Sequence, residues 1–174
     1  YRGVILTKNK IGNLLIPMKD WGITYNKYKE MGKPMPVAFV YGYDPALTVV
    51  AGSPVNGIEY NLAGAIRQQA VELVKCETSD IEVPASAEIV VEGTISPDPD
   101  SYEVEGPFGE GSGFYGEARK RPVVEVSCIT HRNDAIFRGG LIGTRPGVTD
   151  EIKSAVSIMM TVVAWNTLET QEIP

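Results

Sequence analysis

Two glutamates, Glu105 and Glu110, stand five residues apart in the glycine-rich stretch 105–113. Glycine permits tight turns, so two carboxylates on such a loop can converge on one point. A pair of this kind suits proton transfer when one carboxyl stays ionised and the other holds a proton. A free glutamate titrates near ~4.3, so a donor at neutral pH needs a pKa raised by about two units. We expect burial of Glu110 beside Phe108 and Phe114 to supply that shift. The residues alone leave open that both acids are solvated turn residues.

The segments that must position this loop are mostly strands. Runs of β-branched and apolar residues predict a sheet. Pro17 should end the strand expected at residues 14–16. Asp44-Pro45 suits the start of a turn or a helix. The expected strands are residues 3–7, 14–16, 36–43, 87–95, 123–130 and 134–137.

Two longer stretches have helical periodicity. From Glu59 to Val74, apolar residues recur at helical spacing. Near the end, Thr149 or Asp150 is expected to cap a helix whose apolar stripe spans residues 152–163 and packs against another domain or subunit. Strands with two main helices predict an α+β fold with a sheet or barrel core.

Size and charge exclude several classes of protein. The chain has 174 residues and 18.9 kDa, which fits one domain, and its formal net charge is −6. An acidic chain has no general attraction for nucleic acid or anionic membrane. The longest apolar run, residues 155–165, is too short to cross a bilayer.

Cys76 and Cys128 lack a metal-binding spacing, and we expect a cytoplasmic protein. The first residue is Tyr1, so we expect a piece of a longer polypeptide.

The wording of several motifs is more specific than their periodicity. Residues 83–93 read VPASAEIVVEG, residues 105–110 read EGPFGE and residues 113–115 read GFY. In this order they resemble the UbiD family of decarboxylases, which use prenylated flavin mononucleotide (prenylated FMN). Further stretches agree in order and spacing: residues 1–2, 36–38, 42–46, 59–60, 63–67 and 71–76.

The resemblance implies a fold and an activity. The fold is a split β-barrel related to flavin reductases, over residues 1–148, followed by a helix at 149–174 that leads to a C-terminal domain. The activity is reversible, non-oxidative decarboxylation of an aromatic, heteroaromatic or α,β-unsaturated carboxylic acid. Arg2, Glu105 and Glu110 match the family's catalytic trio, with Arg2 and Glu105 positioning the substrate carboxylate and Glu110 donating the proton.

The resemblance also implies ligand sites. Glu59 matches an acidic ligand of a divalent metal ion, usually Mn²⁺, that ties the flavin phosphate, with K⁺ nearby. The family's Asn ligand would precede Tyr1, and its His ligand would fall near Met18. Either another group or water completes the metal shell, or the protein holds the flavin phosphate differently, through Lys19. The residues that match the cofactor contacts are Tyr1, Arg2, Leu14, Leu15, Ile16, Lys19, Asp20 and Ser53.

Two alternatives stay open. One is a carboxylase component acting on a phenol or an aromatic thioester. The other is a non-catalytic UbiD-like subunit that binds a partner through the 152–163 stripe. In each case we expect a homo-oligomer, a dimer or a hexamer, without nucleic acid or membrane as partner. We expect His131, Glu88 and Glu92 to be structural or surface residues.

Overall fold

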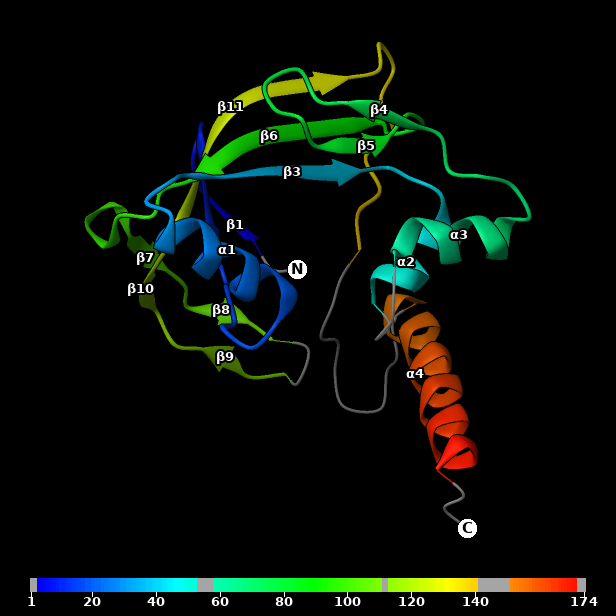
Figure 1. Ribbon diagram of the computed structural model, residues 1–174. Helices are drawn as coiled ribbons and strands as arrows, with labels where there is room; N and C mark the ends of the chain where they lie inside the picture. Colours follow the sequence, from blue (N-terminus) through cyan, green and yellow to red (C-terminus); the bar gives the residue numbers. More distant parts are fainter. Residues whose placement is uncertain (1–2, 53–57, 111–112, 141–150, 172–174) are drawn as a thin grey trace.

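The computed structural model describes residues 3–52, 58–110, 113–140 and 151–171 (Figure 1). Its main element is a five-stranded antiparallel sheet in the order β1-β2-β11-β6-β3. These strands are β1 (Gly3–Thr7), β2 (Lys10–Asn13), β3 (Met35–Tyr41), β6 (Ile89–Ile95) and β11 (Val123–His131).

Three two-stranded ribbons accompany the sheet. They are β4 (Leu73–Lys75) with β5 (Glu82–Pro84), β7 (Glu103–Glu105) with β10 (Arg119–Arg121), and β8 (Phe108–Gly109) with β9 (Tyr115–Gly116). A 3₁₀ turn, η1 (Pro99–Ser101), precedes β7. In the described part of the chain these sheets do not close into a continuous barrel. The α+β expectation is confirmed.

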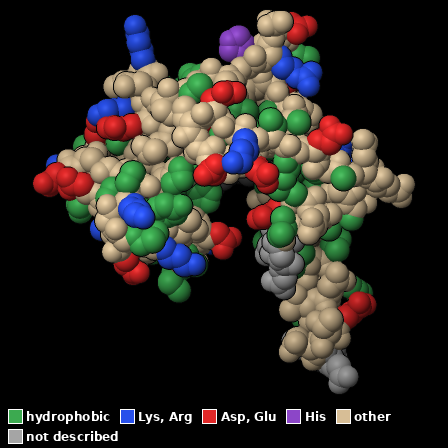
Figure 2. All heavy atoms as spheres, turned by 45° about the horizontal axis from the view of Figure 1, so that its top comes forward, with side chains coloured by type: hydrophobic (Ala, Val, Ile, Leu, Met, Phe, Trp, Pro, Cys, Tyr) green, Lys and Arg blue, Asp and Glu red, His purple; other side chains and the backbone are tan. Residues whose placement is uncertain are grey.

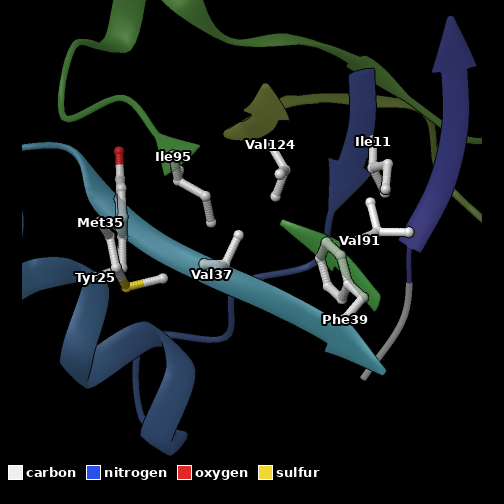
Figure 3. Close-up of a cluster of buried hydrophobic side chains, with 8 residues drawn as sticks. All are labelled: Ile11, Tyr25, Met35, Val37, Phe39, Val91, Ile95 and Val124. Atoms are coloured by element: carbon white, nitrogen blue, oxygen red, sulfur yellow. The ribbon is translucent and has the colours of Figure 1, made fainter. Parts of the chain in front are cut away.

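The main core lies between this sheet and helix α1 (Asp20–Glu30), as Figure 3 shows. Trp21 of α1 stacks on Phe39 of β3 with ring centroids 5.8 Å apart. The Tyr25 hydroxyl donates a hydrogen bond to Ser96 O at 2.9 Å, which gives its one polar atom a partner. Each fully buried aliphatic or aromatic side chain contributes about 1.5–3 kcal/mol. The buried members are Ile11, Tyr25, Met35, Val37, Phe39, Val91, Ile95 and Val124.

A second cluster forms around α2 (Pro45–Ala51) and α3 (Glu59–Arg67). Asp44 caps α2 by accepting a hydrogen bond from Ala46 N at 2.9 Å, as its position before Pro45 predicts. The other carboxylate oxygen of Asp44 lies 2.8 Å from Nε of Arg67 in α3. The end of one helix is thus tied to the beginning of the other.

Helix α4 (Glu151–Thr170) extends away from the sheet (Figure 1). Several of its apolar side chains are exposed, among them Ile158 and Trp165. None of the helices in the described ranges combines the length and the apolar character that crossing a bilayer requires. Thr149 and Asp150, the expected caps, lie outside the described residues.

Four of the expected strands form. Residues 3–7 correspond to β1 with the same ends, and residues 36–43, 87–95 and 123–130 correspond to β3, β6 and β11 with shifted ends. The predictions for residues 14–16 and 134–137 are wrong. Residues 10–13 form the ladder instead, because they pair with β1 and β11 on both sides. Residues 134–137 belong to a loop in which Ile136 N donates to the Glu88 carboxylate at 3.1 Å.

The predicted helix at residues 59–74 is too long. It ends at Arg67, because Gln68 takes the left-handed conformation, with φ 56°. Residues 73–75 then pair with β5 as a strand. Helix α1 was not predicted at all.

Candidate active site

Glu105, the last residue of β7, is fully buried. The antiparallel β7–β10 ladder pairs Glu105 with Arg119 and Glu103 with Arg121. The Arg121 guanidinium reaches along the same face of the ribbon, and its Nε lies 3.0 Å from Oε2 of Glu105. A buried carboxylate needs a compensating charge or hydrogen bonds. The structure therefore places a permanent cation beside this acid.

Strand β2 packs against the side chain of the same glutamate. Gly12 lies so close to Glu105 that a Cβ atom on Gly12 would be 2.9 Å from the glutamate Cγ. Because no real Cβ contact is that short, this position holds glycine to leave room for the acid. The next residue, Asn13, is also fully buried. The end of β2 thus forms a polar, tightly packed wall of the site.

A second ion pair lies beside the first. Lys10 of β2 pairs with Glu103 of β7, and both side chains are partly exposed. The hydrogen bond and the charge of Glu103 raise the pKa of the lysine above its usual 10.5. Charges of opposite sign therefore bind β2 to β7 and β7 to β10.

Glu110 lies in the β8–β9 hairpin. Its N–H donates to Phe114 O at 2.8 Å, and its carbonyl accepts from Gly113 N at 3.0 Å. The residue is half-buried, whereas Phe114 is 76% exposed. The expectation that Phe114 buries Glu110 is wrong, because the hairpin points this ring outward. Glu105 and Glu110 thus occupy different environments, one closed and one partly open.

The residues matched to cofactor contacts lie at the junction of β2 and α1. Leu14 and Leu15 are half-buried, and Leu15 packs on the main core. The others form an exposed surface in which Lys19 precedes α1 and Asp20 is its first residue; they are Ile16, Lys19 and Asp20. This loop thus continues directly from the strand that contacts Glu105.

Three predicted site residues, Tyr1, Arg2 and Ser53, lie outside the described residues. Glu59 is the exposed first residue of α3, and the Met18 side chain is 86% exposed. Within the described ranges, His, Cys, Asp and Glu do not form any group of three or more suited to a metal ion. The metal role of Glu59 stays a prediction.

The space-filling view shows a hollow between the lobe that carries α1 and the ribbons and the arm formed by α4 (Figure 2). Acidic side chains gather at its rim.

Similarity to a known protein family identifies the family of this chain. The model of the UbiD family, described as the 3-octaprenyl-4-hydroxybenzoate carboxy-lyase Rift-related domain, matches residues 1–146. The chain belongs to the UbiD family. The sequence-based family resemblance is therefore confirmed.

Solved UbiD-class structures share the fold. An evolved dimeric form of HmfF from Pelotomaculum thermopropionicum, in complex with prenylated FMN, is 36% identical with a TM-score of 0.86; the match covers 97% of this chain and 38% of that one. Vanillic acid decarboxylase from Sedimentibacter hydroxybenzoicus is 34% identical with a TM-score of 0.78, over 89% of this chain and 33% of that one. Apo 3,4-dihydroxybenzoic acid decarboxylase (AroY) from Klebsiella pneumoniae is 28% identical with a TM-score of 0.83, over 97% and 36%. The chain thus spans between a third and two fifths of the length of these UbiD relatives.

Sequence reasoning missed two residues that lie beside Glu105 in this candidate site, Arg121 and Gly12. Alternation offered a signal for Arg121, since residues 103–105 read EVE and residues 119–121 read RKR, complementary along a two-residue period. The pairing of these distant segments, however, becomes known only from the fold.

Glu92 lies away from the site, and its structural role is supported. The residue is 1% exposed, and its carboxylate accepts hydrogen bonds from Glu77 N, Thr78 N and Thr78 Oγ1 at 2.6–2.9 Å. Burial by itself raises the pKa of Glu92, but these hydrogen bonds outweigh it and hold the pKa below the usual 4.5. His131 is exposed, as a surface role requires.

Proposed function

We propose that this chain is the cofactor-binding part of a carboxy-lyase that reversibly and non-oxidatively decarboxylates an aromatic, heteroaromatic or α,β-unsaturated acid. One observation carries the proposal. A fully buried glutamate, paired with a guanidinium, lies on the ribbon that leads directly into the hairpin of Glu110. The family of the chain and its likeness to an HmfF structure in complex with prenylated FMN support it.

The residues at the β2–α1 junction fit a flavin cofactor in chemical type. They combine apolar side chains with the exposed cation Lys19, which suits a ring system and a phosphate. Leu14, Leu15, Ile16, Lys19 and Asp20 would hold prenylated FMN, together with Tyr1, Arg2 and Ser53. When bound, the cofactor supplies an electron sink that side chains lack.

The chain's own residues then handle charge and protons. Arg2 binds the substrate carboxylate, since a guanidinium matches its two oxygens. Glu105, whose carboxylate contacts the Arg121 guanidinium, fixes the geometry of the site. As the bond between the carboxyl carbon and the α-carbon breaks, carbon dioxide leaves and the electron pair remains with the organic fragment. Glu110 gives its proton to that carbon and regains one from solvent, for which its partial exposure is suited.

The described residues do not fit a complete divalent-metal site. They offer Glu59 without a second and a third ligand of the usual types. The part of residues 149–174 in this proposal is to connect the cofactor-binding region to the remainder of the polypeptide.

Glu110→Gln in the full-length polypeptide, reconstituted with prenylated FMN, tests the proposal. The substrates are vanillic acid, 3,4-dihydroxybenzoic acid and a set of heteroaromatic and α,β-unsaturated acids, and the measurement is release of carbon dioxide. The wild type should turn over at least one acid. The variant should lose about 10²–10⁴-fold in kcat while retaining the flavin absorption spectrum.

Glu117→Gln is the matched control, because Glu117 is an exposed acid in the same connection between β7 and β10. It should keep the wild-type rate. Wild-type turnover in Glu110→Gln would refute the proton-donor role. Product formation that depends on added bicarbonate, without decarboxylation of any acid, would favour the carboxylase alternative.

A further inference from the structure

We propose that Arg121 is a positioning residue for Glu105, and that it releases Arg2 to serve the substrate carboxylate. The inference rests on the proposed function and deepens it. The resemblance matches Arg2 to the arginine of the family's catalytic trio, and a guanidinium there could both pair with the Glu105 carboxylate and orient the substrate carboxylate. A second guanidinium beside Glu105 allows these tasks to be divided.

The contact is built into regular structure. Arg121 lies on β10, opposite Glu103 in the ladder, and its side chain reaches diagonally to Glu105, with 3.0 Å between Nε and Oε2. Glu105 is fully buried, and the Arg121 side chain is 23% exposed. Removing one partner of a buried ion pair is strongly destabilising, so Arg121 should strongly affect how Glu105 is held.

Neighbouring charges are engaged with other partners. Arg119 of β10 is aligned with Glu105 in the ladder, but its side chain pairs with Glu117, with Nε 3.0 Å from Oε2. Lys10 of β2 pairs with Glu103. Among the cations of the described residues, Arg121 is thus the one that forms an ion pair with Glu105.

The packing limits how Glu105 can respond. The backbone of Gly12 lies close to the stem of Glu105, because a Cβ atom added at residue 12 would be 2.9 Å from the glutamate Cγ. The stem of Glu105 therefore packs against β2, while its carboxylate contacts the Arg121 guanidinium. Loss of Arg121 leaves the buried carboxylate without this partner, so the carboxylate must rotate or draw in water. Either response disturbs the catalytic step while the substrate carboxylate keeps its contact with Arg2.

Kinetics of the full-length holoenzyme test this role, with the acid that the wild type turns over best. Arg121→Met should lower kcat by about 10²-fold while KM stays near the wild-type value. Arg121→Lys restores the charge but not the planar fork, so it should recover a large part of kcat. Arg119→Met, the matched control on the same strand, should leave both constants unchanged.

A double-mutant cycle with Glu105→Gln separates positioning from general damage to the fold. Urea unfolding of the same four proteins should show that Arg121→Met is far less destabilising when residue 105 is already neutral. Equal effects in both backgrounds, or wild-type kcat in Arg121→Met, would overturn the positioning role. If Arg121→Met fails to fold, a Lys variant with unimpaired kcat in the wild-type background and no energetic coupling to Glu105→Gln would overturn it as well.

The outcomes also separate this inference from the proposed function. A wild type that decarboxylates a test acid, with Arg121→Met equal to Arg119→Met, refutes Arg121 alone. A wild type loaded with flavin but inactive on every acid refutes the proposed function and the positioning role with it. The unfolding cycle would still report whether the ion pair stabilises the fold.

Discussion

Gly12 and Glu105 are in contact across two strands, with the Cα of the glycine facing the stem of the buried glutamate. A Cβ atom at Gly12 would lie 2.9 Å from Cγ and 3.2 Å from Cβ of Glu105. The carboxylate of the same glutamate contacts the Arg121 guanidinium, with 3.0 Å between Oε2 and Nε. The absence of a side chain at residue 12 therefore leaves room for the acid in this position.

Gly12→Ala should consequently displace Glu105. Overpacking of a tight site costs about 1–3 kcal/mol in the free energy of unfolding, which urea denaturation measures. Turnover by the holoenzyme should fall as well, since the carboxylate moves. Gly139→Ala is the control, because nothing lies within 4 Å of an added Cβ there. Equal stability of the two variants would show that β2 and β7 adjust freely.

Glu92 should make the stability depend on pH on the acid side. Its hydrogen bonds hold its folded-state pKa below the usual 4.5, so the folded protein binds the proton more weakly than the unfolded chain does. The resulting stabilisation is present above the unfolded-state pKa and is lost as the pH falls through the lower, folded-state pKa. The difference in free energy of unfolding between wild type and Glu92→Gln should therefore be largest near neutrality and shrink below about pH 4.5. A difference that stays constant from pH 7 to pH 3 would contradict this prediction.

Thr78→Val should destabilise the protein by about 1–3 kcal/mol, because it deprives the buried Glu92 carboxylate of a charge-assisted hydrogen bond. The bond measures 2.6 Å between Thr78 Oγ1 and Glu92 Oε2. Thr7→Val removes a hydroxyl of the same kind at an exposed position, where the partner is Asn9. Thermal or urea unfolding should detect little change in that control. A similar loss in both variants would mean that the buried bond has no special weight.

Asp44 should separate a capping effect from an ion-pair effect. Asp44→Ala removes both the hydrogen bond to Ala46 N and the pairing with Arg67, and should cost about 1–2 kcal/mol. Asp44→Asn retains a good capping group and loses only the charge at a partly exposed pair, so its cost should stay below about 1 kcal/mol. Unfolding curves for the two variants that superimpose would assign the whole effect to the ion pair.

The sequence revealed the strands whose pattern is local and continuous. Residues 89–95 and 123–131 are rich in β-branched side chains, and both are strands in the structure. Helix α1 escaped prediction because it contains aromatic and β-branched residues and a glycine, which are poor helix formers. Gly22 has its reason in the fold: a Cβ there would lie 2.1 Å from Ile16 O, where the helix crosses the preceding loop.

In the candidate site, too, local sequence patterns predicted some residues and missed those that only the fold brings together. Glu105 and Glu110 could be predicted because both belong to one short continuous motif, residues 105–110. The partner of Glu105 was not found, because Arg121 becomes its neighbour only through the register of β7 and β10. Likewise, Gln68 carries no sign of its left-handed backbone, since glycine or asparagine is the usual residue at such a position.

The β7–β10 ladder holds both ends of the segment that carries Glu110. At its first end, Gly106 has φ 98°, and a Cβ there would lie 3.1 Å from Ala118 Cα, so the two ends are closely apposed. The hairpin is in this respect a replaceable loop, closed at its base by the ladder pair of Glu105 and Arg119. Grafting tips of other lengths between residues 107 and 117 would retune the reach of the acid while its anchored counterpart keeps its place.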